Sequence, residues 1–328
     1  MSFEFVLSLI PADAGVHWLD QVLNSLTNNF NEGSFFNQVF NLRALLALAL
    51  VSLTCGAVGS MVVGSRMAFF SDALAHCAFA GVSLGYVFFE LFVLGARPKE
   101  EFWRWVTPIM VVFGVAVGAG IAYVRGHTGL ASDTVIGVFF AFSLGFAAML
   151  KNIINDRSVF SLEDFLFGDP LFVSAPEILT MVWLTLFTWV FLFFFYNRMV
   201  FSSFNSSLAL SRRYPVTLLY YLFVILLALI VNICLRYVGV LLINALLIVP
   251  AATAFNLGRN LREVFWITVL ISLVICLAGL GASWELQVHS GVRFGVSGTI
   301  VMLGVGFFFI SMIIGKFKSA PSIKSGIN

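Results

Sequence analysis

The chain has 328 residues, of which 60% are hydrophobic and only 10% are charged, and its mean hydropathy is +1.02. This composition excludes a soluble globular domain and indicates a polytopic membrane protein. The net charge of +2 is too small to favour nucleic-acid binding. The four cysteines stand singly in apolar stretches without C-x-x-C spacing, so neither a disulfide framework nor a thiolate cluster is indicated.

Residues 1–41 carry four acidic residues and no Lys or Arg. We expect them to form an extracytoplasmic arm that includes an interfacial amphipathic helix. The first ten residues are apolar, but they lack the basic region and the small-residue cleavage site of a signal peptide. Insertion into the membrane is therefore expected to depend on the transmembrane helices themselves.

Apolar runs long enough to cross a membrane as helices follow the arm. They predict an all-α polytopic bundle of about nine spans, with eight or ten as alternatives, in a permease domain of residues 42–315. The least certain boundaries are those of the short fourth run and of the tripeptide Arg236-Tyr237-Val238, which separates the sixth run from the seventh. The runs cover 42–63, 69–94, 105–124, 134–150, 177–196, 216–236, 239–255, 264–284 and 296–315.

The distribution of charge predicts the orientation of these spans. With the arm outside, ten basic residues fall in segments 64–68, 125–133, 197–215, 256–263 and 316–328, and eight fall elsewhere. Lys and Arg favour the cytoplasmic side of a membrane. We therefore expect the N-terminus outside and a polar tail of residues 316–328 in the cytoplasm.

The second run holds a carboxylate and an imidazole four residues apart, Asp72 and His76. On a helix these side chains project from one face, as two ligands of one ion would. A carboxylate at the centre of a membrane helix costs about 3 kcal/mol to insert, so it indicates function. The spacing alone also allows a purely structural interpretation. In it, Ser71 or Asp72 caps a helix, and His76 is a histidine whose hydrogen bonds are satisfied within the helix bundle.

The seventh run contains two further features, Pro250 and Asn244. Pro250 removes a backbone hydrogen bond and is expected to kink or break the helix, which membrane proteins tolerate where a helix lines a cavity. Asn in such a run more often joins helices than binds a ligand, so a place on a metal path is the second interpretation of Asn244. Glycines four residues apart, as in Gly114-x-x-x-Gly118, predict close helix packing.

The chain lacks the common catalytic motifs. It contains no G-x-x-x-x-G-K-[ST] and no H-E-x-x-H, and the segment 291–295 has Arg where G-x-S-x-G requires Ser. We therefore expect a transport subunit that is not itself an enzyme, and any ATP-driven action requires a separate subunit.

Two long stretches carry a family resemblance. The first reads SDALAH from Ser71 to His76 and continues to Gly85, and the second reads GVLLINALLIVPAATA from Gly239. They resemble the signatures of the metal-ion permeases of ATP-binding-cassette (ABC) importers, the membrane subunits for zinc, manganese and iron(II). The shorter stretches DTVIG at 133–137 and LFGD at 166–169 resemble further elements of that family.

The resemblance implies a permease that dimerises, engages two ATPase subunits in the cytoplasm and receives metal from an extracytoplasmic binding protein. It assigns Asp72 and His76 to the metal path. The segment that couples to the ATPase departs from the family pattern, because NSSLALSRR at 205–213 lacks the usual acid and glycine. The usual Ser of the second stretch is replaced by Asn244. The residues predicted for coupling are Asn205, Ala209, Arg212 and Arg213.

Together these features predict import of a divalent transition metal across a bacterial inner membrane by alternating access. A carboxylate oxygen paired with an imidazole suits Zn²⁺ or Mn²⁺, with Fe²⁺ as a third cargo, and no permanently bound cofactor is expected. One alternative is an ABC permease for a larger cargo such as a siderophore or vitamin, for which Asp72 would be dispensable. The other is a metal carrier that needs no ATP.

Overall fold

The computed structural model describes residues 14–27, 34–92, 102–151, 168–204, 206–291 and 294–318. These ranges contain helices and no strand, as the apolar runs predict, because a helix satisfies its own backbone hydrogen bonds within lipid. The helices are α2 (Ala14–Thr27), α3 (Val39–Gly64), α4 (Ala68–Phe92), α5 (Phe102–His127), α6 (Ser132–Lys151), α8 (Ala175–Phe204), α9 (Ser206–Ser211), α10 (Val216–Val238), α11 (Val240–Leu257), α12 (Leu261–Ser290) and α13 (Val296–Lys318), with 3₁₀ turns η1 (Phe35–Asn37) and η3 (Pro170–Phe172).

Nine of the described helices are long and apolar enough to cross a membrane, which confirms the predicted number of spans. The short run at 134–150 is a helix, α6, and a single residue, Gly239, separates α10 from α11. Of the two alternatives for Pro250, a break is wrong, because α11 continues from Val240 to Leu257. The fifth span is longer than predicted, since α8 extends to Phe204, well beyond residue 196.

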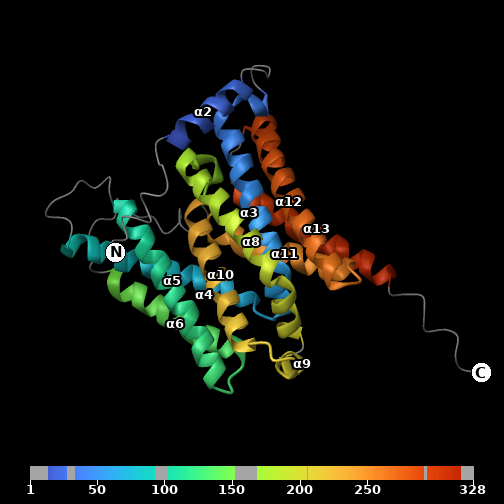
Figure 1. The fold of residues 1–328 in the computed structure, drawn as a ribbon. Helices are drawn as coiled ribbons and strands as arrows, with labels where there is room; N and C mark the ends of the chain where they lie inside the picture. Colours follow the sequence, from blue (N-terminus) through green and yellow to red (C-terminus); the bar gives the residue numbers. More distant parts are fainter. Residues whose placement is uncertain are drawn as a thin grey trace, which may run out of the picture.

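The helices pack around α3, which lies in the middle of the bundle beside α8, α11 and α12, while α4 packs with α5, α6 and α10 (Figure 1). Small residues permit the close crossings, as the glycine spacing predicts. A Cβ atom on Gly59 would collide with the backbone of Leu247 in α11, and one on Gly81 would lie 3.0 Å from the Cα atom of Met110 in α5. A Cβ on Gly114 would overlap the side chain of Asn232 in α10.

The connections between helices gather at two ends of the bundle. At one end, Ser65, Arg125, Ser203 and Thr217 line one cavity, so the turns that follow α3, α5 and α8 lie together. Figure 1 shows α9 at this end and α2 at the opposite one. Three of the segments expected in the cytoplasm, 64–68, 125–133 and 197–215, therefore contribute to the same end.

A sharp corner between α10 and α11 explains the glycine of the LFGD stretch. Gly239 has φ +84° and Gly168 has φ +54°, values that favour glycine. Gly168 lies directly against Val238 and Gly239, so a Cβ atom there would overlap their backbone. The hydroxyl of Ser297 donates to the carbonyl oxygen of Gly168 at 3.4 Å, which ties α13 to the same corner. The first two residues of the stretch lie outside the described ranges.

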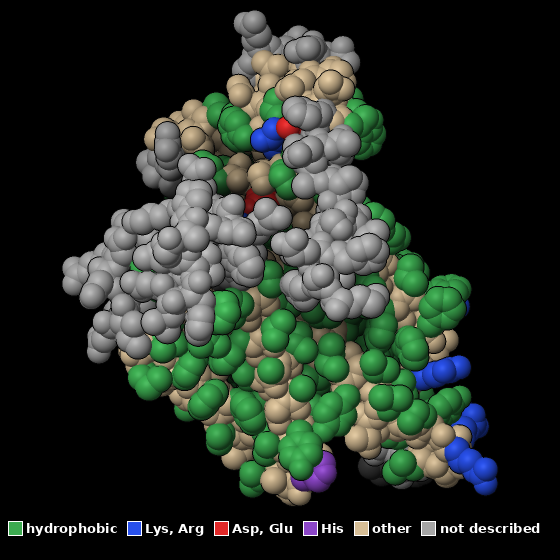
Figure 2. Space-filling view, turned by 60° about the vertical axis from the view of Figure 1, so that its left-hand side comes forward, with side chains coloured by type: hydrophobic (Ala, Val, Ile, Leu, Met, Phe, Trp, Pro, Cys, Tyr) green, Lys and Arg blue, Asp and Glu red, His purple; other side chains and the backbone are tan. Residues whose placement is uncertain are grey.

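One face of the molecule carries a broad apolar surface, with Lys and Arg side chains at its lower edge (Figure 2). Large exposed apolar residues are also frequent along α8, where Trp183 is 56% exposed and Phe193 is 84% exposed. Surfaces of this kind are what lipid-facing helices present. The chain is accordingly an integral, multi-pass membrane protein.

Candidate metal path at Asp72 and His76

Helix α4 positions both predicted ligands. It begins at Ala68, so Ser71 and Asp72 lie inside its first turns and neither is the residue that caps it. The hydroxyl of Ser71 donates to the carbonyl oxygen of Ala68 at 3.2 Å instead of accepting from a backbone N–H group. The capping interpretation of this stretch is therefore wrong.

The two side chains lie on one side of α4, as their spacing predicts. The Nε2 atom of His76 is 3.8 Å from the Oδ1 atom of Asp72. Two ligands that each lie about 2.1 Å from a common ion are at most about 4.2 Å apart, so this separation is compatible with a shared metal. The side chain of His76 is 25% exposed and that of Asp72 is 43% exposed, which leaves the pair accessible.

Asn244 joins this pair from α11. Its Nδ2 atom donates a hydrogen bond of 2.9 Å to the same Oδ1 atom of Asp72. The other end of the amide is unsatisfied, because its Oδ1 atom has less than 1 Å² of accessible surface and no hydrogen-bond partner. Asn244 therefore joins two helices, as the first interpretation predicts, and it contacts the predicted metal ligand Asp72, while its place on a metal path stays a prediction.

An aromatic side chain that sequence reasoning missed orients the imidazole. The ring of Phe140 in α6 meets the ring of His76 edge to face, with centroids 4.7 Å apart and an angle of 83° between the planes. Nothing in the local sequence distinguishes Phe140 from the other phenylalanines of α6. Its contact depends on how α6 packs against α4.

Asp72, His76 and Asn244 are the polar side chains that meet at this site. Within the described residues no group of three or more His, Cys, Asp or Glu side chains could hold a metal. Two strong ligands and one amide are fewer than the four ligands of a structural zinc site. The arrangement suits an ion that binds briefly and leaves.

The predicted coupling segment lies at the end of the bundle that carries α9. Ala209 is fully buried, whereas Arg212 and Arg213 are exposed. The guanidinium carbon of Arg212 lies 5.7 Å from the ring centroid of Phe201, and Arg213 has φ +58°, an uncommon value for a residue with a side chain. Asn205 lies outside the described residues.

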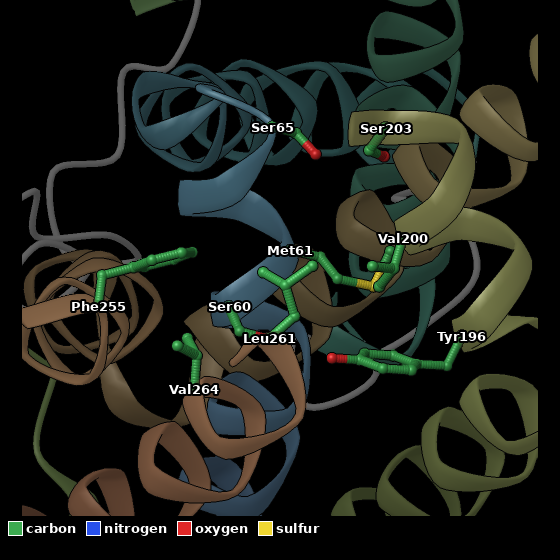
Figure 3. A pocket seen from close by; sticks show the side chains of 9 residues that line it. All are labelled: Ser60, Met61, Ser65, Tyr196, Val200, Ser203, Phe255, Leu261 and Val264. Atoms are coloured by element: carbon green, nitrogen blue, oxygen red, sulfur yellow. The ribbon is translucent and has the colours of Figure 1, made fainter. Parts of the chain in front are cut away.

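Two of the cavities formed by the described residues lie at the end that carries α9. The larger, about 310 Å³, includes Arg125, whose guanidinium lies 4.6 Å from the ring centroid of Tyr220. The smaller, shown in Figure 3, has a volume of about 10 Å³, which is room for about one water molecule. Ser60 of α3 and Tyr196 of α8 both line it. The smaller cavity is therefore a packing gap and not a ligand site.

A third cavity, of about 440 Å³, lies at the opposite end, between η3, α3, α12 and the start of α13. Asp169 lines it and accepts a hydrogen bond of 3.0 Å from the backbone N–H of Leu171. Burial raises the pKa of the Asp169 carboxyl, and that hydrogen bond opposes the shift. This carboxylate lies at the end of the bundle opposite α9, and it is distant in sequence from Asp72.

The whole membrane domain matches a known family model, that of the ABC 3 transport family, over residues 37–315. The chain belongs to the ABC 3 transport family. The family resemblance predicted from the two signature stretches is thereby confirmed. The match begins after α2 and ends within α13, at residue 315, so α2 lies outside it.

Individual relatives cover the same region. The chain is 28% identical over 279 residues to the manganese transport system membrane protein MntC of Halalkalibacterium halodurans, covering 84% of this chain and 90% of the relative. It is 25% identical over 283 residues to the chelated iron transport system membrane protein YfeD of Yersinia pestis, covering 86% and 88%. The fold resembles PsaBC from Streptococcus pneumoniae, solved in complex with Fab, with a TM-score of 0.67, 24% identity and coverage of 92% and 100%.

Proposed function

We propose that this member of the ABC 3 transport family is the membrane permease of an ABC importer for a divalent transition metal. The observation that carries the proposal is the meeting of Asp72, His76 and Asn244 between two membrane helices, with 3.8 Å between the two strongest ligands. An ionisable pair at such a place needs a functional reason. The names of the relatives, a manganese and a chelated-iron system, support a metal as the cargo.

The chemistry of the donors narrows the cargo. A carboxylate oxygen suits Mn²⁺, imidazole suits Zn²⁺ and Fe²⁺, and thiolates, which would favour Cu(I), do not contribute to the described site. All four cysteines are buried and free, and none belongs to a cluster of potential ligands among the residues that the structure describes. We infer that manganese or zinc is carried, with iron(II) as a third cargo.

The partners follow from where the site and the coupling segment lie. The pair on α4 is accessible and offers only two strong ligands, so a second copy of the chain completes the coordination in a homodimer. The end with α9 faces the cytoplasm of a bacterium and receives the ATP-binding subunit, through Ala209 and the exposed Arg212 and Arg213. The arm and η3 face outwards, where an extracytoplasmic protein delivers the metal.

Transport into proteoliposomes tests the proposal. Vesicles that contain this chain with its ATPase and binding protein are expected to take up ⁵⁴Mn²⁺ or ⁶⁵Zn²⁺ only when ATP is supplied to the ATPase. The double variant Asp72→Ala, His76→Ala is expected to lose uptake while it still inserts and assembles, because the ligands are gone. Unchanged uptake by this variant would refute the proposal, and uptake without ATP would favour a carrier.

The chain offers a matched control for this experiment. Glu285 and His289 in α12 form another acid–histidine pair at the same spacing, with 3.4 Å between His289 Nδ1 and Glu285 Oε2. Their side chains are 69% and 80% exposed, so the pair is solvated. Glu285→Ala, His289→Ala removes the same chemical groups and is expected to leave uptake near that of the parent.

A further inference from the structure

The amide of Asn244 contacts the same carboxylate oxygen that lies nearest to His76. Its Nδ2 atom and the Nε2 atom of His76 both approach Oδ1 of Asp72, at 2.9 Å and 3.8 Å. An N–H group cannot bind a cation, so in this arrangement the amide holds the carboxylate without contributing a ligand. The amide carbonyl, which could serve as a ligand, is buried without a partner.

A buried acceptor without a donor costs free energy and calls for an explanation. The terminal torsion of Asn has a broad, roughly two-fold preference, so a half turn of the amide exchanges Nδ2 and Oδ1 with little steric change. Without a cation, the turned amide would place two acceptor oxygens against each other, which is unfavourable. With a cation between Asp72 and His76, the same turn places an oxygen beside the positive charge, which is favourable.

We propose that Asn244 is a specificity-determining residue whose amide holds Asp72 through Nδ2 in the empty site and turns to offer Oδ1 to the cation. The inference rests on the proposed metal transport and adds a third, uncharged oxygen ligand to it. A set of two oxygens and one nitrogen is harder than a carboxylate–imidazole pair. Asn244 therefore shifts the preference of the path towards Mn²⁺ and away from Zn²⁺.

If Asn244 only joins helices, its loss should have the same effect as the loss of another interhelical amide. Helix α11 contains such an amide, which serves as the control. The Nδ2 atom of Asn256 donates to the hydroxyl of Ser311 in α13 at 3.1 Å, so Asn256 also joins α11 to a neighbouring helix. Asn256 stands three turns further along the helix, away from Asp72. Loss of either amide removes an interhelical hydrogen bond, but only loss of Asn244 removes a metal ligand.

Competitive uptake of ⁵⁴Mn²⁺ and ⁶⁵Zn²⁺ into the same proteoliposomes tests the inference. For Asn244→Leu we expect the KM for Mn²⁺ to rise about 10-fold or more, the range seen when groups that support a metal site are lost. The KM for Zn²⁺ is expected to change less, so the Mn²⁺ to Zn²⁺ ratio falls. Asn244→Asp keeps an oxygen at the same position and is expected to retain the preference for Mn²⁺. Asn256→Leu is expected to keep both KM values and the ratio.

An unchanged ratio in Asn244→Leu would overturn the inference, and so would an equal change in Asn256→Leu. If Asn244→Leu does not insert into the membrane, the Mn²⁺ to Zn²⁺ uptake ratio of Asn244→Asp tests the inference instead. A fall in that ratio would contradict the role of the oxygen. Failure of the parent to transport either metal would instead refute the proposed function. The two failures are therefore distinguishable.

Discussion

Two of the polar groups that join helices of this bundle differ in how completely their hydrogen bonds are satisfied. In the first, Arg236 of α10 donates to the hydroxyl of Thr107 in α5 at 2.7 Å and lies 3.7 Å from the carboxylate of Glu177 in α8. Glu177 also accepts a hydrogen bond of 2.8 Å from the backbone N–H of Ser174. We call this group the Arg236 clamp.

The second group, at Asp72, is different in kind. The side chains of Arg236 and Glu177 are 26% and 24% exposed, whereas those of His76 and Asp72 are 25% and 43% exposed. The imidazole is thus as buried as the clamp, and only the carboxylate is more accessible. The clamp pairs opposite charges and joins three helices, whereas the site at Asp72 leaves the amide oxygen of Asn244 unpaired. The clamp thus has the partners expected of a structural group, whereas the site at Asp72 keeps one acceptor without a partner.

Breaking the clamp is expected to have the largest effect on stability. Arg236→Met removes the charge that compensates Glu177 and the hydrogen bond to Thr107, and should cost about 2 kcal/mol of unfolding free energy. Thermal unfolding in detergent measures the loss. Glu177→Gln added to the variant should recover part of it. Asp72→Ala is expected to leave the unfolding temperature near that of the parent, and a loss as large as that of Arg236→Met would erase the distinction between the two groups.

The second prediction concerns the corner at Gly239, which follows the last turn of α10, where Arg236 lies. It tests whether the contact with Gly168 stabilises this end of the helix. Gly168→Ala places a Cβ atom against the backbone of Val238 and Gly239, at a φ value that favours glycine. We expect a loss of about 1.5 kcal/mol, the size typical of a strained backbone position. Gly126 has open space around the position of a Cβ atom, so Gly126→Ala is a control in which no collision occurs. Equal unfolding temperatures for the two variants would contradict the role of the corner.

The ion pair that attaches the arm is expected to have the smallest effect. Asp20 of α2 accepts a hydrogen bond of 2.6 Å from Arg43 of α3, and the two side chains are 31% and 29% exposed. Pairs near a surface contribute about 0.5 kcal/mol, so Asp20→Asn should barely change the unfolding temperature. Limited proteolysis of α2 measures the local effect, which is expected to be faster cleavage of the arm. An unfolding loss comparable to that of Arg236→Met would show that the arm is part of the bundle's core.

Local sequence determined the elements of this protein. The thickness of a bilayer sets the length of an apolar helix, so the runs predicted nine spans, and the period of 3.6 residues placed Asp72 and His76 on one side of α4. Helix ends were less predictable. The missing N–H of Pro250 interrupts a hydrogen bond but not α11, because membrane helices accommodate proline where neighbouring helices support the backbone.

Only the tertiary structure decided which residues complete the site. Asn244 stands 172 positions from Asp72, and no local pattern links an amide in one helix to a carboxylate in another. The packing of α11 against α4 brings them together, as the packing of α6 brings Phe140 to His76. The same holds for Gly168 and Gly239, whose contact depends on a loop that returns to the corner of two later helices. Sequence periodicity determines which face a side chain occupies, but only helix packing determines what that face meets.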